Sequence, residues 1–419
     1  MEPSGRSESR PRVVTPARRR RQTEAERRRA SRAAISSPSL PATLDGGVLT
    51  ATAILTSIGV VMIYSTTAPL SMGHAVPPHF TRHLAAVLLA TLCAAVTLRI
   101  PLQRVRQLAR PFWIASVALL VLTLVAGVEV NGAERWLAVP GTNFRFQPAE
   151  IAKLATVLVV ASTLAGGRIE RRNIQRTAVY TAIPAALLLQ QPDLGNAGLV
   201  IALVGLLLFV AGAPLRRLLV PSAIAALGAA AFVAWNPYTR RRVTGFLDPW
   251  AHADDEGFQL VQSFVAFGRG GSLGVGVGDG RQKLGFLPEA HTDFILSGVA
   301  EELGLVGVLL VLGAFAALAV VGTRIARRSP DRFAALVAFG ATSLLVVPAA
   351  VNAAVVMGLL PTTGFTLPFL SYGRTSLVIC GIAVGLILRA ASREAAPAKA
   401  PDARERSRGR ATRRERVIA

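Results

Sequence analysis

Long apolar runs with almost no charge occupy most of the chain, and they constrain its fold more than any other feature. Of the 419 residues, 52% are hydrophobic and only 17% are charged, which is not the composition of a soluble protein. Most runs approach the roughly 20 residues that cross a hydrocarbon core as a helix. We place them at residues 47–67, 84–98, 112–129, 149–166, 177–190, 197–213, 218–235, 294–322, 333–358 and 375–390. The sequence therefore predicts an all-α integral membrane protein with about ten transmembrane helices.

Basic residues alternate from one connecting segment to the next. The Arg-rich segments are RIPLQRVRQLARP (99–111), GRIERRNIQR (167–176), PLRR (214–217) and TRIARRSPDR (323–332). The intervening segments are mostly poor in basic residues, and they cover 68–83, 130–148, 191–196, 236–293 and 359–374. Because cytoplasmic loops carry an excess of Arg and Lys, both termini are predicted to be cytoplasmic. A large extracytoplasmic loop then lies between the seventh and eighth helices.

The two ends of the chain are basic and lack an apolar period. Residues 1–45 hold 11 Arg and 5 acidic residues, and residues 391–419 hold 9 basic and 4 acidic residues. We predict two disordered cytoplasmic tails flanking a membrane domain at 46–390. About half of the net charge of +22 lies in these tails, so it indicates attraction to anionic membrane lipids and not to nucleic acid.

Ionisable residues gather where the large outer loop re-enters the membrane. The segment 282–304 reads QKLGFLPEAHTDFILSGVAEELG, and its titratable residues include Glu289, His291, Asp293, Glu301 and Glu302. Carboxylates at the mouth of a membrane span are costly to place, so we take them as candidates for function.

Two further acidic positions allow more than one interpretation. Glu150 and Lys153 open the fourth span three residues apart, on one helix face, where we expect them to pair. That pair could be purely structural or could belong to a polar site. Asp193, in QQPDLGN, could simply cap the sixth helix or could contribute to the same site.

Three other features of the outer segments also leave alternatives open. Arg240, Arg241 and Arg242 are the exception to the charge alternation. Either the long loop escapes the rule, or the three form an anion site, since guanidinium groups suit phosphate oxygens. Trp136 could anchor at the membrane interface or could stack against a sugar ring. The histidines at 79 and 83 could form a metal pair, but headgroup-level polar residues are the simpler interpretation.

Irregular backbone at membrane depth survives only when it lines a cavity or is buried in protein. The outer segment 359–374, LLPTTGFTLPFLSYGR, is such a stretch. We therefore expect outer loops two to five to converge on one polar cavity, with nothing comparable on the inner side. The glycine-rich run at 268–280 is a weak phosphate-binding motif and is better interpreted as a flexible surface segment. The residues before it, 257–268, have a helix-like period.

Several of these segments together resemble the SEDS family (shape, elongation, division and sporulation). They are QPAEIAKLA, QPDLG, FLDPW, GFQLVQSFVAFGRGG, LPEAHTDFI, AEELG and LLPTTGFTLPFLSYG, in order over residues 47–390. Members are membrane glycosyltransferases that polymerise lipid II, the lipid-linked precursor of peptidoglycan. The motifs are more similar to the division member than to the elongation member.

The resemblance implies roles for particular residues. Asp293 matches the family's catalytic aspartate. Trp136, Glu150, Lys153 and Asp193 match its polar and aromatic site positions, and His291 and Ser371 lie within matched motifs. One position departs from the pattern: the family has SYGGSS where this chain has SYGRTS, which places Arg374 at a glycine position.

The implied reaction joins a donor sugar to an acceptor hydroxyl and releases undecaprenyl diphosphate. Asp293 would be the base; burial could raise its pKa, or a partner such as Lys153 could lower it. Arg240, Arg241 and Arg242, or a Mg²⁺ or Mn²⁺ ion held by carboxylates, could steady the diphosphate; no cofactor is certain.

The implied partners are a class B penicillin-binding protein (a transpeptidase) and other divisome membrane proteins. The implied location is the inner (plasma) membrane at the division septum, with the active site on the extracytoplasmic face. Two rival functions stay open: a lipid II flippase or transporter, and a scaffold for the transpeptidase. A transporter favours a site near the midplane, whereas the ionisable residues here cluster on one face.

Overall fold

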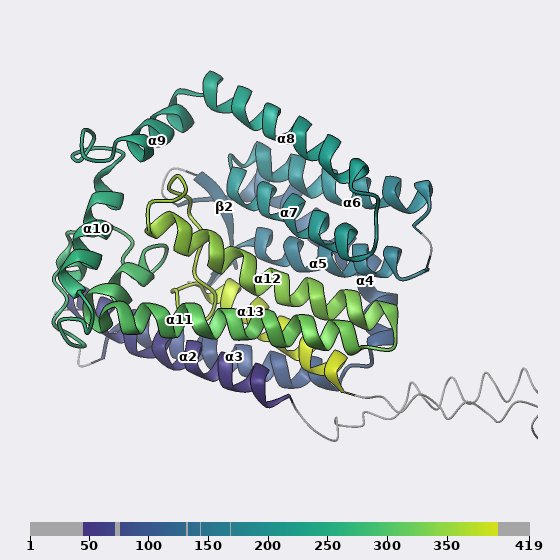
Figure 1. Cartoon of the computed structure of the whole chain (residues 1–419), viewed down its shortest axis with the longest axis horizontal. Coiled ribbons are helices and arrows are strands. Elements are labelled where there is room, and N and C mark those ends of the chain that lie inside the picture. Colours follow the sequence, from purple (N-terminus) through teal and green to yellow (C-terminus); the bar gives the residue numbers. More distant parts are fainter. Residues whose placement is uncertain (1–44, 72–75, 131–132, 143, 168, 393–419) are drawn as a thin grey trace, which may run out of the picture. The chain divides into compact units, whose positions relative to one another are not determined.

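The computed structural model describes residues 45–71, 76–130, 133–142, 144–167 and 169–392 (Figure 1). The predicted tails at 1–45 and 391–419 therefore lie almost entirely outside the described residues. The described part is mostly helical, as the apolar runs predicted.

Each of the ten predicted segments contains or forms a helix. These are α2 (Gly46–Thr67), α3 (Pro78–Arg99), α4 (Leu102–Ala126), α5 (Pro148–Leu164), α6 (Arg171–Gln190), α7 (Leu194–Val210), α8 (Arg216–Trp235), α11 (Ile295–Arg328), α12 (Arg332–Val356) and α13 (Arg374–Ala391). In the described part of the chain, 6 of them are long and apolar enough to cross a membrane: α2, α3, α4, α11, α12 and α13. The full count of ten spans stays a prediction.

Three helices, α3, α4 and α6, begin well before the apolar runs indicated. The helix α3 starts at Pro78 and α4 at Leu102, six and ten residues before the predicted spans. Polar residues such as Arg104 and Arg106 continue the helix because they can remain at the membrane surface, where charge costs little. Hydropathy thus located the apolar part of each helix but not its ends.

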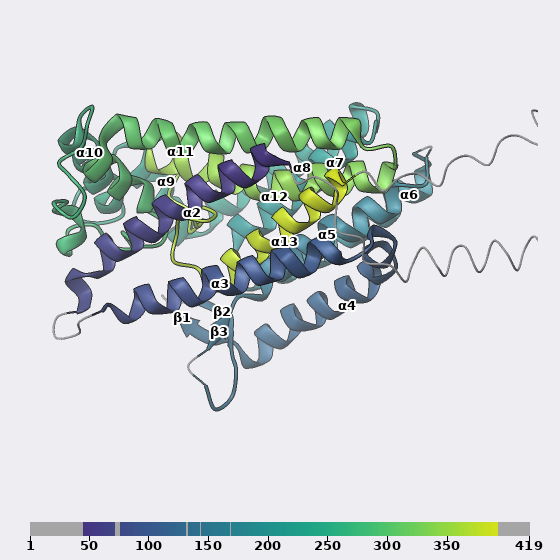
Figure 2. The same cartoon turned by 90° about the horizontal axis from the view of Figure 1, so that it is seen from below.

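The helices α5, α12 and α13 form the buried centre of the bundle. The helix α13 packs against α3, α12, α11 and α5, and α11 packs against α2, α10 and α12 (Figures 1 and 2). A Cβ atom at Gly381 would clash with the backbone carbonyl of Ala90, so a glycine is required where α13 meets α3. Close approach at small residues is how membrane helices gain packing energy without a hydrophobic driving force.

A small sheet follows α4, and the all-α prediction missed it. Strands β1 (Val128–Val130), β2 (Ala133–Ala138) and β3 (Arg145–Phe146) pair antiparallel in the order β1-β2-β3. Strands this short show too few alternating positions to be distinguished from an amphipathic loop.

The long outer loop contains two helices, α9 (Pro237–Leu247) and α10 (Phe258–Gly270). The period at 257–268 correctly indicated α10, and α9 carries the three consecutive arginines. Two short 3₁₀ turns, η1 (Pro69–Ser71) and η2 (Gln282–Leu284), complete the elements.

The glycine-rich run is packed along α11 and is not a phosphate cradle. The backbone N–H groups of Val275 and Gly276 donate to the carbonyls of Glu301 and Glu302, at 3.0 and 3.1 Å. These carbonyls are available because α11 is broken at Gly304, where φ is 66° and ψ is −164°. That region of backbone space is essentially restricted to glycine.

We predict that Gly304→Ala destabilises the protein by at least about 1–3 kcal/mol, because alanine cannot adopt this backbone conformation. Its Cβ would also clash with the backbone N of Gly274. The control is Gly313→Ala on the same helix, where the added Cβ meets open space. It should leave stability unchanged or raise it by up to about 1 kcal/mol. Thermal unfolding in detergent measures both, and equal midpoints for the two variants would contradict the assignment.

Candidate active site

Asp293 lies in the connection that leads into α11, and α12 fixes its backbone. The side-chain amide of Asn352 donates to the carbonyls of Asp293 and Phe365, at 2.7 and 2.6 Å. A Cβ atom at Gly364 would lie 3.4 Å from Oδ2 of Asp293, so the carboxylate faces the last outer loop. One buried amide therefore joins the two irregular segments that the sequence predicted to converge.

A second set of hydrogen bonds fastens the same two segments. The Ser371 hydroxyl donates to the carbonyl of Thr292 at 2.6 Å and accepts from the N–H of Leu367 at 2.7 Å. The N–H of Tyr372 donates to the carbonyl of His291 at 2.8 Å. Ser371 is almost fully buried, so it acts as a positioning residue in this arrangement.

The environment of Asp293 stabilises its protonated form. Burial raises its pKa to about 7, and the negative charge of Glu289 acts in the same direction, while the positive charge of Arg242 opposes both. Glu289 is held with a positive φ of 57° and accepts from the Thr292 hydroxyl at 2.6 Å. The result is a carboxylic acid that can take up or release a proton near neutral pH.

Lys153 pairs with Glu150 and not with Asp293, which decides an alternative that the sequence left open. Its Nζ donates to Oε1 of Glu150 at 2.7 Å, and both side chains are nearly buried. The geometry of α5, with the two residues one turn apart, satisfies each charge locally. The predicted pair is thus confirmed, and the cation whose charge reaches Asp293 is Arg242.

The three outer arginines do not share one environment. Arg240 and Arg241 are exposed on α9, whereas Arg242 is half-buried. Only Arg242 contributes to the electrostatics of Asp293. The sequence offered no way to separate them, because the orientation of α9 depends on tertiary packing.

A small cavity of about 30 Å³ connects the ion pair to the same region. Gln147, Glu150, Lys153, Asn196 and Gly364 contribute to its wall. These residues come from the second, third and fifth outer segments and the helices they lead into. Three of the four segments that we expected to converge therefore meet at this cavity, whereas the segment 236–293 does not contribute to its wall.

Asp193 caps α7, one of the two roles that the sequence allowed. It accepts from the backbone N–H and the side-chain amide of Asn196, at 3.1 and 2.7 Å. The adjacent turn is held by Arg135 of β2, whose Nε donates to the carbonyl of Gln191 at 3.2 Å. Trp136 follows on β2, half-buried and paired with Val128.

His291 belongs to an aromatic cluster and not to a metal site. Its ring lies 5.7 Å from that of His79 and 5.8 Å from that of Tyr372. Burial lowers the pKa of His291 and so favours the neutral ring. No group of three or more His, Cys, Asp or Glu side chains gathers within the described residues, so they do not fit a metal held by the protein alone.

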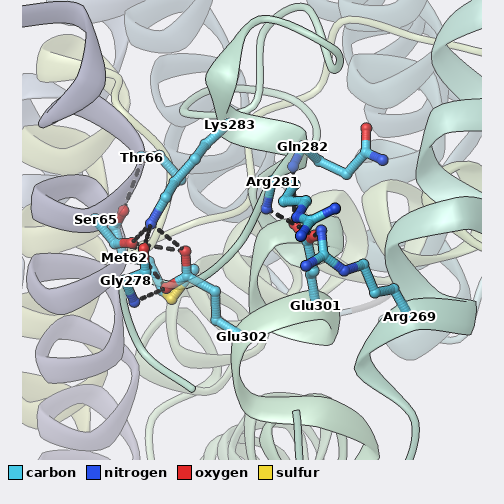
Figure 3. Close-up of polar contacts among 10 residues, drawn as sticks. All are labelled: Met62, Ser65, Thr66, Arg269, Gly278, Arg281, Gln282, Lys283, Glu301 and Glu302. Carbon is cyan, nitrogen blue, oxygen red and sulfur yellow. Dashed lines mark hydrogen bonds and ion pairs between the residues drawn. The ribbon is translucent and has the colours of Figure 1, made fainter. Parts of the chain in front are cut away.

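Glu301 and Glu302, candidates from the sequence, are instead satisfied inside the fold (Figure 3). Glu302 accepts from Lys283 Nζ and the Ser65 hydroxyl, both at 2.7 Å, and from the N–H of Gly278 at 3.0 Å. Glu301 accepts from Arg269 at 3.1 Å and from two backbone N–H groups. This network attaches the glycine-rich loop to α11 and α2.

Sequence reasoning missed three residues that shape the site: Asn352, Gly364 and Tyr372. The one available signal was Asn352, an amide in the middle of an apolar span. Arg374, at the family's glycine position, places its guanidinium 4.9 Å from the ring centroid of Phe144 and so links the second and fifth outer segments.

Comparison with known proteins places these features in context. The model of the FtsW/RodA/SpoVE family, described as "Cell cycle protein", matches residues 47–396. A probable peptidoglycan glycosyltransferase FtsW from Halomonas elongata is 41% identical over 82% of this chain and 89% of its own length. One from Geobacter metallireducens is 40% identical over 81% and 92%.

Solved structures are similar as well. One, described as showing structural coordination of polymerization and crosslinking by a peptidoglycan synthase complex, superposes with a TM-score of 0.71. It is 32% identical over 84% of this chain and 98% of that chain. The rod shape determining protein RodA of Thermus thermophilus gives a TM-score of 0.62, with 31% identity over 84% of this chain and 97% of its own.

The buried ion pair around Glu302 generates a stability prediction. Lys283→Met should destabilise the protein by about 3–5 kcal/mol, because it leaves a buried carboxylate uncompensated. The double variant Lys283→Met/Glu302→Gln should recover part of this loss, since the remaining group is neutral. Thermal unfolding of both variants in detergent tests the idea; a double variant as unstable as the single one would mean that lost packing, and not charge, dominates.

Proposed function

The chain belongs to the FtsW/RodA/SpoVE family of cell cycle proteins, the SEDS family, and on that premise we propose that it is a peptidoglycan glycosyltransferase. Its substrate is lipid II, which it polymerises into glycan strands. The observation that carries the proposal within this structure is Asp293, a half-buried carboxyl group whose pKa is raised to about 7.

Asp293 is suited to act as the general base. The 4-hydroxyl of the acceptor GlcNAc attacks C1 of the donor MurNAc, and the hydroxyl proton moves to the Asp293 carboxylate. The bond from C1 to the phosphate oxygen breaks, and undecaprenyl diphosphate leaves with the bonding electron pair. A base whose pKa lies near the working pH is substantially deprotonated and still has a useful affinity for the proton. General base catalysis is most efficient under this condition.

Arg242 is the candidate for stabilising the leaving group. Its positive charge acts on Asp293, so base and cation serve one reaction centre. A guanidinium offers two parallel donors to phosphate oxygens as negative charge develops. Arg240 and Arg241 are exposed and contribute attraction at longer range.

The remaining predicted residues take supporting roles in this proposal. Ser371 and the backbone of His291 hold the Asp293 segment against the last outer loop. Glu150 and Lys153 line the cavity behind Gly364, and Asp193 fixes the start of α7 beside it. Trp136 offers a half-buried ring to a sugar face.

Membership of the family supports a proposal for the setting of the reaction. A solved relative is described as a complex that coordinates polymerization and crosslinking. We therefore propose a class B penicillin-binding protein as the crosslinking partner, together with other divisome membrane proteins. The protein would lie in the plasma membrane at the division septum, with Asp293 on the extracytoplasmic face.

We predict that Asp293→Asn abolishes lipid II polymerisation. The substitution keeps the size and hydrogen-bonding capacity of the side chain but removes the base, which is worth roughly 10²–10⁴ in rate. Glu289→Gln is the matched control in the same segment and should reduce the rate far less. Glycan chains are measured with purified protein at matched membrane abundance. If Asp293→Asn makes polymer at the wild-type rate, Asp293 is not the base, and a scaffold role for the protein gains support.

The same variant should be more stable than the wild type at high pH. The pKa of Asp293 is raised in the folded state relative to its ordinary value of 3.8, so folding favours the protonated form. Wild-type stability therefore falls as the pH rises from about 4 to about 7. The melting temperature of Asp293→Asn relative to the wild type should increase over this window. A constant difference between pH 4 and pH 8 would contradict the raised pKa.

The pH profile of the reaction tests the role of Arg242. The rate under kcat/KM conditions should rise with pH and reach half its maximum near 7, because the deprotonated carboxylate is the active form. Arg242→Gln removes the charge that opposes protonation, so the midpoint should move to higher pH. Arg240→Gln, the exposed neighbour, should leave the midpoint in place. Identical midpoints in all three proteins would remove Arg242 from the site.

The orientation of the helices can be tested with reporter fusions. Fusions in 99–111, 167–176 and 323–332 should report the cytoplasm, and fusions in 130–148 and 236–293 should report the exterior. A cytoplasmic signal from the segment 236–293 would place Asp293 on the wrong side for lipid II polymerisation.

A further inference from the structure

A second, larger cavity lies at the opposite end of the bundle from Asp293. Its volume is about 810 Å³, within the range of ligand-binding pockets. It is enclosed by the first turns of α2, α4 and α12 and the last turns of α11 and α13. This corrects the expectation that the inner side would hold nothing comparable to the outer loops. The cavity was not predicted, because helix ends form most of its wall and the connection 329–331 adds only a short stretch.

Four arginines give this cavity a positive lining: Arg106, Arg324, Arg328 and Arg389. Arg389 is 97% buried, at a relative exposure of 3%, so its positive charge lies in the wall itself. Arg106, Arg324 and Arg328 take part in none of the ion pairs found among the described residues. The Arg106 guanidinium lies 5.7 Å from the ring centroid of Phe333, which also lines the cavity.

The two acidic residues of the cavity are already engaged. Asp45 accepts from the N–H of Val48 at 3.2 Å, and Asp331 accepts from that of Ala334 at 2.9 Å, so each caps a helix. In contrast, α4 begins after Pro101 without a side-chain cap, and its first residues, Leu102 and Gln103, line the cavity. A helix start whose N–H groups have no cap adds a preference for an anion.

We propose that this cavity binds a phosphate group, supplied by the headgroup of an anionic phospholipid. Guanidinium groups and helix N–H groups are the donors that phosphate oxygens prefer. A basic pocket between membrane helices on the cytoplasmic side is the setting in which lipid phosphates are bound. The site is separate from the glycosyltransferase chemistry and does not depend on it.

The position of the cavity favours a lipid over a soluble phosphate compound. The ends of five helices surround it: α2, α4, α11, α12 and α13. All five are long and apolar enough to span a membrane. Such ends lie at headgroup depth. Arginines near the carboxyl ends of α11 and α13 also complement the helix dipoles. The helix dipole explains why arginines lie at the carboxyl ends of α11 and α13. It does not explain why Arg106, near the start of α4, lines the same cavity.

The test compares two charge-matched variants of the full chain. Arg106→Gln/Arg324→Gln/Arg328→Gln removes three exposed arginines of the cavity and leaves the buried Arg389 in place. Arg99→Gln/Arg110→Gln/Arg327→Gln removes three exposed arginines from α3, α4 and α11 that do not line it. Each protein is placed in phosphatidylcholine nanodiscs doped with phosphatidylglycerol or cardiolipin, and retained lipid is measured by native mass spectrometry.

The cavity variant should retain anionic lipid at least about tenfold more weakly than the wild type, while the control variant should stay within about twofold. Inorganic phosphate and pyrophosphate are titrated as competitors. If phosphate and pyrophosphate do not displace the retained lipid, the headgroup is supported as the ligand. If phosphate binds to the cavity but no lipid is retained, the lipid is overturned as the source of the phosphate group. Equal loss in both variants, or no loss in either, overturns the site.

Discussion

The site depends on one buried amide that bridges two irregular segments of chain. Asn352, in the middle of α12, donates to the carbonyls of Asp293 and Phe365. Backbone carbonyls without partners are costly away from water, so the amide removes a penalty that either segment alone would carry. The hydrogen bonds of Ser371 and Tyr372 continue the same junction. The position of the Asp293 carboxylate is therefore a property of α12 as much as of its own loop.

The acidic residues of the bundle have two kinds of environment. Glu150, Glu301 and Glu302 each have a Lys or Arg partner at 2.7–3.1 Å and are held in place. Asp293 differs, because burial and the charge of Glu289 outweigh the influence of Arg242 and raise its pKa. Paired carboxylates stabilise the structure, whereas a carboxyl group with a raised pKa can exchange a proton. The segment from Asp293 to Glu302 contains both kinds of carboxyl group.

The two ends of the bundle are chemically distinct. At one end, loops rich in Pro and Gly pack around Asp293 and a small polar cavity. At the other, short basic connections bring helix ends around a larger cavity lined by arginine. Positive charge at that end follows the rule that orients membrane proteins, and tertiary packing then concentrates part of it in a pocket.

The sequence by itself determined the ten long apolar helices, because a run of apolar residues in a membrane must satisfy its backbone internally. It also determined the family and made Asp293 the candidate base, since both inferences depend on motifs that are contiguous in the chain. It did not determine which of Arg240, Arg241 and Arg242 acts on Asp293, or that Glu301 and Glu302 anchor the glycine-rich loop. Only the tertiary structure decided these points, because each depends on how residues far apart in the sequence are brought together and on which charges remain buried beside one another.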